Sequence, residues 1–252
     1  MDQLYRETPL MTLAVLRTTG ALGLVLLLSI AATQSYAQDY GAVVAQPDRT
    51  EADRQTDKRR DPVSLLAFTG PKTGWTVLDM AALAGYSTEL LARSVGPTGK
   101  VYAQNAKDND KLTARMASPA MRNVTILLRA FDDPVLAEAG SIDLITFFFA
   151  YHDTTYMEVD RAKMDKAMFA ALKPGGFLVV ADHSAKPEDG AMVGKTFHRI
   201  AEQTLRSEIE AAGFKFVAAG DFLRHPEDAR DAVVFHNPTA VDEFVLKFQK
   251  PM

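Results

Sequence analysis

The sequence predicts an α/β fold built on a mostly parallel sheet whose last strand is antiparallel. From residue 76 onward, short apolar runs typical of buried parallel strands alternate with segments of helical periodicity. Near the C-terminus, strand patterns at residues 216–218 and 244–248 are separated by a polar stretch, residues 223–240, that shows no helical pattern. Two strands joined without a helix between them favour antiparallel pairing. Helices are expected on both faces of the sheet.

The length and composition fit one sizeable α/β domain with extensions. The 252 residues are 47% hydrophobic, which is ample for a packed core. A formal net charge of −4 gives no electrostatic reason to expect nucleic acid as a partner. The chain has no cysteine, which excludes disulfides, cysteine nucleophiles and cysteine-ligated zinc.

The first 37 residues have the pattern of a signal peptide. Arg17 precedes an apolar run, residues 21–32, of the length of a signal-peptide core. Ser35 and Ala37 place small residues where a signal peptidase reads them, so we expect cleavage after Ala37 and a periplasmic or secreted product. The run is shorter than the roughly 20 residues of a membrane span, so no stable span is expected after cleavage. An uncleaved anchor is the alternative.

The rest of the chain divides into a polar N-terminal extension, residues 38–61, and a domain, residues 62–252. The extension has no apolar stripe and is expected to be solvated, with at most an exposed helix at residues 50–60. The domain begins with a helix that Asp61 caps and Gly70 ends. Further strands are expected at residues 76–79, 100–105, 124–128, 142–149 and 177–181, and further helices at residues 87–95, 107–117, 156–172 and 196–212.

The stretch that follows the first strand is the most informative. It reads Asp-Met-Ala-Ala-Leu-Ala-Gly, residues 79–85, and leads into a helix whose N-terminal N–H groups and dipole favour negative or polar ligand groups. It resembles motif I of the class I S-adenosylmethionine (SAM)-dependent methyltransferases, which is acidic-x-Gly-x-Gly-x-Gly. Asp79 takes the acidic position, and Ala81, Leu83 and Gly85 take the glycine positions. If Leu83 must be left-handed, the conformation costs about 1–2 kcal/mol.

A second segment carries the same resemblance. Leu-Lys-Pro-Gly-Gly, residues 172–176, precedes an apolar strand, as in this family. The resemblance to this family covers residues 62–250. Through residues 151–153, 182–184 and 198–200, the chain is also similar to a group of exported bacterial proteins known as predicted methyltransferases. The resemblance implies a Rossmann-like methyltransferase fold with a central, mostly parallel seven-stranded sheet and an antiparallel last strand. It also implies SAM as cofactor and a small-molecule methyl acceptor.

The resemblance implies a set of cofactor-binding residues at the ends of the strands. These are Asp79, Ala81, Leu83, Gly85, Asn105, Asp132 and Tyr151. Asn105 stands where the family has an acidic residue that holds the ribose hydroxyls, and Asp132 where it has one that contacts the adenine amino group. An amide lacks the charge that strengthens such hydrogen bonds. Replacing Leu83 by Gly and Asn105 by Asp is therefore expected to tighten SAM binding.

The catalytic candidates lie at the carboxyl ends of the strands, where open parallel sheets bind ligands. Some methyl acceptors must lose a proton, which suits a histidine beside a carboxylate. We expect His152, next to Asp153, as general base, with His183 as the alternative. No metal is expected, because no zinc-binding spacing exists. The alternative is a magnesium or calcium ion on Asp153 and Asp182, as in some O-methyltransferases.

Two other functions stay open beside an exported SAM-dependent methyltransferase. One is an exported, non-catalytic binding protein that has lost or weakened SAM binding, which Leu83 and Asn105 favour, as does export itself because SAM is made in the cytosol. The other is an NAD-dependent oxidoreductase, which the glycine pattern and the final strand pair disfavour. The sequence specifies neither the acceptor nor the oligomeric state.

Overall fold

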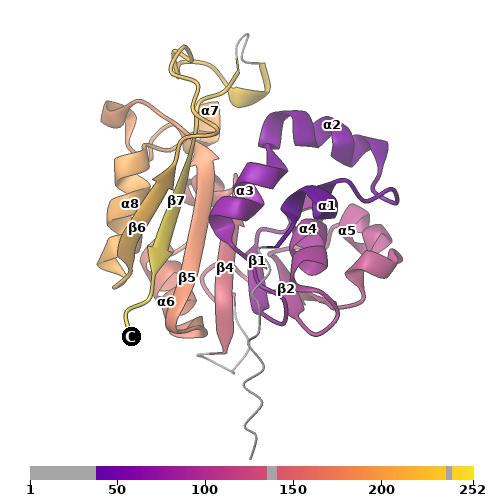
Figure 1. Ribbon diagram of the computed structural model, residues 1–252. Helices are drawn as coiled ribbons and strands as arrows, with labels where there is room; N and C mark the ends of the chain where they lie inside the picture. Colours follow the sequence, from indigo (N-terminus) through magenta and orange to yellow (C-terminus); the bar gives the residue numbers. More distant parts are fainter. Residues whose placement is uncertain (1–37, 135–140, 237–239) are drawn as a thin grey trace, which may run out of the picture. The chain divides into compact units, whose positions relative to one another are not determined.

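The computed structural model describes residues 38–134, 141–236 and 240–252, so the expected signal peptide lies outside the described residues. Within them, seven strands form one sheet in the order β3-β2-β1-β4-β5-β7-β6 (Figure 1). They are β1 (Thr76–Met80), β2 (Lys100–Asn105), β3 (Val124–Leu128), β4 (Ile142–Phe148), β5 (Leu172–His183), β6 (Lys215–Gly220) and β7 (Glu243–Gln249). Strands β1 to β5 are parallel, and β7 lies antiparallel between β5 and β6. The predicted fold class and final strand pair are confirmed.

Helices cover both faces of this sheet (Figure 1). They are α1 (Tyr40–Val44), α2 (Glu51–Arg60), α3 (Pro62–Thr69), α4 (Tyr86–Val95), α5 (Asp110–Arg115), α6 (Arg161–Ala171), α7 (Gly194–Phe197) and α8 (Glu202–Ala211). Val77 and Leu144 belong to one apolar cluster with α3 and α4, whereas Leu78 and Phe147 belong to another with α6 and α8. None of these described helices has the length and apolar content that crossing a membrane requires.

Residues 38–61 are not the solvated extension that their polarity suggests. They form α1 and α2 and belong to one compact unit, Gln38–Met252. Arg49 is buried and pairs with Asp57 at 2.7 Å, and the buried Asp53 pairs with Arg115 of α5 at 2.8 Å. Hydrophobic periodicity missed this packing because ion pairs, rather than an apolar stripe, attach α2.

One predicted helix begins later than expected, and another is divided in two. The helix expected at residues 156–172 begins only at Arg161, where the Asp160 carboxylate caps the N–H of Lys163, and residues Tyr151–Thr155 form the 3₁₀ helix η2. The helix expected at residues 196–212 is divided into α7 and α8 at His198, whose φ is +55°. These two irregular segments bring His152, Asp153 and His198 to the carboxyl ends of β4 and β5.

Candidate functional site

The loop between β1 and α4 keeps the backbone shape of a glycine-rich turn without most of its glycines. Ala81, Leu83 and Gly85 have φ angles of +51°, +51° and +82°. Leu83 therefore does adopt the left-handed conformation, which costs about 1–2 kcal/mol at a residue with a Cβ. The Leu83 side chain is 52% exposed, so packing does little to offset that cost.

Two amide side chains at the end of β2 hold this loop in place. Gln104 Oε1 accepts a hydrogen bond from the N–H of Ala81 at 3.0 Å. Asn105 Oδ1 accepts from the N–H of Leu83 at 2.8 Å, and Asn105 Nδ2 donates to the Leu83 carbonyl at 3.1 Å. The expected ribose contact of Asn105 thus needs correction: its amide is buried and engaged at both ends by the loop backbone.

Asp79 anchors the start of α4 to the sheet. It is buried, and it accepts hydrogen bonds from the hydroxyls of Thr88 at 2.7 Å, Ser87 at 2.9 Å and Thr146 at 2.8 Å. Burial raises the pKa of Asp79, and these hydroxyl bonds oppose that rise. The carboxylate thereby joins β1, β4 and the first turn of α4, which fixes where the loop begins and ends.

A cavity of about 360 Å³ opens beside this loop. Its walls include Arg59 and Arg60 of α2, Leu65 and Leu66 of α3, loop residues 81–84, and Phe148 and Phe149 at the end of β4. The guanidinium carbon of Arg60 lies 3.2 Å from the ring centroid of Phe149, and its buried Nη1 has no hydrogen-bond partner. Burial lowers the pKa of Arg60 to about 10, which leaves it charged at neutral pH. The cavity thus combines mostly apolar walls with two cationic residues, Arg59 and Arg60, although Nη1 of Arg60 is itself shielded from solvent.

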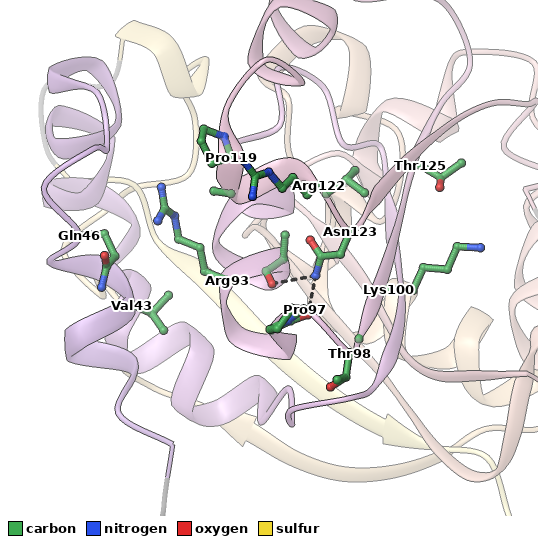
Figure 2. A pocket seen from close by; sticks show the side chains of 15 residues that line it. Val43, Gln46, Arg93, Pro97, Thr98, Lys100, Pro119, Arg122, Asn123 and Thr125 are labelled. Carbon is green, nitrogen blue, oxygen red and sulfur yellow. Dashed lines mark hydrogen bonds between the residues drawn. The ribbon is translucent and has the colours of Figure 1, made fainter.

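A larger hollow, of about 780 Å³, lies at the other end of the parallel strands (Figure 2). It is lined by the turn from Gly96 to Lys100 before β2 and by Asn123 before β3. Asn123 Nδ2 already donates to the carbonyls of Ala92 and Gly96 at 3.1 and 2.8 Å. Because open parallel sheets bind ligands at the carboxyl ends of their strands, we place the functional site at the smaller cavity.

His152 is buried between two carboxylates. Its Nδ1 lies 2.6 Å from Asp182 Oδ1, and its Nε2 lies 3.1 Å from Asp153 Oδ1. Burial lowers the pKa of His152, but Asp182 and Asp153 outweigh burial and raise the pKa to about 10. The imidazole is therefore protonated at neutral pH in this arrangement, which does not suit the role of general base that its position suggests.

The pKa of His183 is shifted in the opposite direction to that of His152. It is buried against the ring of Phe149, with ring centroids 5.4 Å apart, and its Nδ1 lies 2.9 Å from Glu243 Oε1 without the orientation of a hydrogen bond. Burial lowers the pKa of His183 well below its ordinary value. A neutral imidazole therefore stands directly behind a wall of the cavity.

Tyr151 and Asp132 make side-chain contacts with residues of α6 and α8. Tyr151 is fully buried among core residues packed on α6 and α8, and its hydroxyl oxygen lies 3.0 Å from Asp165 Oδ2 and 2.9 Å from Glu208 Oε2. The prediction that Tyr151 binds the cofactor is therefore corrected: it is a core residue. Asp132 pairs with Lys163 of α6 at 3.1 Å, and its contact with adenine stays a prediction.

Asp153 and Asp182 do not face a common point. Asp153 meets the Nε2 edge of the His152 ring and Asp182 meets the Nδ1 edge, so the two carboxylates lie on opposite sides of the imidazole. The alternative prediction of a magnesium or calcium ion between them is therefore not supported. Asp153 instead faces His198, whose Nδ1 lies 3.4 Å from Asp153 Oδ1.

Sequence reasoning missed Gln104 and Arg60. Gln104 directly precedes Asn105, which the family resemblance marks, but the role of Gln104 depends on the pairing of β2 beside β1. Arg60 ends a helix of charged residues that reads as solvated. A cation in the last turn of such a helix ordinarily serves the helix dipole, so nothing local indicates that Arg60 enters a cavity.

A family model and a curated relative match the chain. The model of the ubiE/COQ5 methyltransferase family matches residues 55–205. The ubiquinone/menaquinone biosynthesis C-methyltransferase UbiE of Salmonella arizonae is 29% identical over 167 residues, which cover 63% of this chain and 63% of the relative. The chain thus spans less than two thirds of the relative's length.

Solved methyltransferase structures share the fold. A SAM-dependent methyltransferase from Aquifex aeolicus superposes with a TM-score of 0.59 at 19% identity, covering 79% of this chain and 97% of that chain. Phosphoethanolamine N-methyltransferase 2 of Haemonchus contortus, in complex with SAM, superposes with a TM-score of 0.57 at 14% identity over 77% of this chain and 53% of that chain. These likenesses confirm the Rossmann-like methyltransferase fold.

Proposed function

Because the chain belongs to the ubiE/COQ5 methyltransferase family, a family of class I SAM-dependent enzymes, we propose that it transfers a methyl group from SAM to a small, largely apolar acceptor. The observation that carries the proposal is the cavity beside the motif I loop, with its apolar walls and the cationic residues Arg59 and Arg60. Its volume of about 360 Å³ lies within the range of small-molecule sites.

The residues of this cavity fit the carboxylate end of SAM. The loop has the left-handed turn of the motif, and no side chain caps the N-terminus of α4. A carboxylate in this cavity would lie in the favourable field of Arg59, Arg60 and the helix N-terminus. Asp79 fixes the turn, and residues 81–84 form the cofactor-facing wall. When bound, SAM supplies an electrophilic methyl group on a positively charged sulfur.

Where the acceptor must lose a proton, we assign its removal to His183 rather than to His152. A neutral imidazole accepts a proton and an imidazolium does not. Burial keeps the pKa of His183 low and the ring neutral, whereas Asp182 and Asp153 keep the pKa of His152 high and that ring protonated. The contact between His183 and Phe149 places this base next to the wall of the cavity.

The acceptor that we propose is an aromatic, hydroxyl-bearing ring. The Salmonella arizonae relative is a ubiquinone/menaquinone biosynthesis C-methyltransferase, which makes a quinol-like ring the first choice. Leu65, Leu66 and Phe148 give the cavity the flat apolar surfaces against which such a ring packs.

One observation favours a second candidate function, a binding protein that uses SAM weakly or not at all. Asn105 engages its carbonyl oxygen and one N–H with the backbone of Leu83, so no carboxylate stands at the end of β2 for the ribose hydroxyls. Charge-assisted hydrogen bonds contribute about 1.5–3 kcal/mol each, so their loss weakens SAM roughly tenfold or more.

Titration calorimetry with SAM and S-adenosylhomocysteine separates the two candidates. Wild-type protein starting at Gln38 should bind both ligands, and Arg60→Gln should weaken both severalfold, since the cavity loses one of its two cationic residues. Lys58→Gln, the same change of charge on the exposed side of α2, is the matched control and should bind as the wild type does. Methyl transfer from labelled SAM to a panel of quinols then tests the acceptor. Absence of any SAM binding to the wild type at millimolar concentration would favour the binding protein.

Export is a separate proposal. The apolar run at residues 21–32 and the small residues Ser35 and Ala37 support cleavage after Ala37 and a periplasmic or secreted enzyme. N-terminal sequencing of the protein from its native host should begin at Gln38. A cytosolic product that retains the apolar run would contradict this.

A further inference from the structure

A cluster of two histidines and one carboxylate lies at the carboxyl ends of β4 and β5, outside the cavity. His152 and Asp153 belong to η2, and His198 follows α7. Each of the three residues offers one ligand atom, and these atoms lie within 4.8 Å of one another. We propose that His152, Asp153 and His198 bind a divalent transition-metal ion, with zinc as the first choice. The proposal does not depend on the methyltransferase reaction.

The distances between the ligand atoms suit such an ion. Asp153 Oδ1 lies 3.1 Å from His152 Nε2 and 3.4 Å from His198 Nδ1. Zinc bonds of about 2.0–2.1 Å at tetrahedral angles place neighbouring ligand atoms about 3.3 Å apart. The three groups therefore need little rearrangement to surround one ion. Two imidazoles and a carboxylate are also a donor set that zinc and other late transition metals prefer over magnesium or calcium.

Asp182 gives independent support, because it fixes the outer edge of the His152 ring. Its Oδ1 lies 2.6 Å from His152 Nδ1, and its carboxylate also accepts the backbone N–H groups of His152 at 2.8 Å and His183 at 2.8 Å. Histidines that bind metals usually donate their second ring N–H to such a carboxylate, which sets the tautomer and raises the basicity of the ligating nitrogen. Asp182 holds the Nδ1–H, so when a metal ion displaces the proton on Nε2, Nε2 is the metal-facing atom of His152.

The backbone conformation of His198 also supports a functional role for this residue. Its φ of +55° is rare for a residue other than glycine, and strain of this kind, about 1–3 kcal/mol, gathers at functional sites. The N–H of His198 donates to the Gly194 carbonyl at 3.1 Å, and the break at this residue turns its ring toward His152, with the ring centroids 5.4 Å apart. An uninterrupted helix would not present His198 to η2.

The site would keep a coordination position open. His198 and Asp153 are each 27% exposed at the side chain, so water or a small ligand can reach the ion from solvent. The hydroxyl of Tyr156, 2.5 Å from Asp153 Oδ1, borders the same face and can hydrogen-bond a metal-bound water. Three protein ligands with an open fourth position are the pattern of catalytic rather than structural zinc sites.

Binding of the metal alone tests the proposal. Protein starting at Gln38 is freed of metals with a chelator and titrated with zinc chloride, with competition against a zinc-binding dye as readout, and cobalt(II) is added separately to record its visible absorption. We expect one zinc per chain and a cobalt spectrum typical of four-coordinate nitrogen and oxygen ligands.

Three variants separate a specific site from loose binding. His198→Asn should lower zinc affinity at least a hundredfold, and asparagine tolerates the left-handed backbone, so folding is preserved. Asp182→Asn should lower zinc affinity by about 10–100-fold without abolishing binding, as expected for a carboxylate that orients a ligand. His225→Gln, which changes a histidine in another loop, is the control and should bind zinc as the wild type does.

Two results would overturn the proposal. One is the absence of stoichiometric zinc on the wild-type protein. The other is an affinity that stays the same in His198→Asn when the thermal midpoint shows that this variant is folded.

Discussion

Replacing Asn105 by Asp should loosen the loop that carries Ala81, Leu83 and Gly85. The Asn105 amide is an acceptor for the Leu83 N–H and a donor to the Leu83 carbonyl. A carboxylate keeps the first hydrogen bond but loses the second, and it places negative charge about 3 Å from a carbonyl oxygen. This outcome is opposite to the tighter SAM binding expected from the sequence, where aspartate at position 105 restores the family's acidic residue.

The size of the effect follows from the lost donor. Leaving a buried carbonyl without its partner costs about 1–3 kcal/mol, and burying a charge at a residue that is only 6% exposed adds to it. We expect Asn105→Asp to lose about 2 kcal/mol of stability at pH 8. For a chain of this size that corresponds to a fall of roughly 4–8 °C in the thermal midpoint.

The assay compares thermal midpoints of Asn105→Asp and Asn109→Asp. Asn109 caps α5 with its carbonyl oxygen only, accepting from the N–H groups of Lys111 and Leu112, so an aspartate there accepts the same bonds. Its midpoint should change by less than about 2 °C, since such substitutions stay within about 0.5 kcal/mol. Lowering the pH toward about 4 should narrow the gap between the variants, because the protonated carboxyl group of Asn105→Asp again has a donor for Leu83. An Asn105→Asp protein as stable as the control at pH 8 would refute the role of the amide.

Two further predictions concern Leu83 and Asp165. Leu83→Gly should be more stable than Leu83→Ala by about 1 kcal/mol in urea unfolding, because only glycine relieves the Cβ strain at φ +51°; equal stabilities would show that the left-handed turn is not maintained in solution. Burial raises the pKa of Asp165 to about 7, above its unfolded value of about 3.9, so the folded state holds this proton more tightly and stability falls as pH rises from about 4 to 7. Asp165→Asn should remove up to about 4 kcal/mol of that fall in the free energy of unfolding, measured by urea unfolding between about pH 4 and 7. If the variant shows the same pH dependence as the wild type, the Asp165 carboxylate is ionised throughout this range.

The sheet could be predicted because each of its strands has a local apolar pattern. The apolar run at residues 142–149 becomes β4 at the centre of the sheet, and the polar stretch before residue 244 leads to the antiparallel β7. Residues 38–61 escaped prediction because their attachment depends on Arg49, Asp53 and Arg115, and the partners of an ion pair leave no periodic trace in the sequence.

The loop at residues 81–85 could be predicted from its motif, but the contacts that hold it could not. The left-handed backbone at Leu83 followed from its motif position, whereas the contacts of Asn105 depend on the register between β1 and β2, which no local pattern contains. Tyr151 was assigned by the resemblance, whereas in the structure it follows β4 in η2 and is buried in the core.

The hydrogen bonds from Gln104 and Asn105 to the loop have a thermodynamic consequence for ligand binding. They order the turn during folding, so a ligand that enters the cavity does not have to immobilise it. Fixing the backbone of one residue costs about 1–2 kcal/mol, and a mobile glycine turn would add that cost to the binding step. In this chain, the affinity of a ligand for the site beside the motif I loop depends on the contacts that the ligand makes, and no entropy cost for ordering the loop is subtracted from it. Glycine can therefore be dispensed with where a neighbouring strand supplies preorganisation.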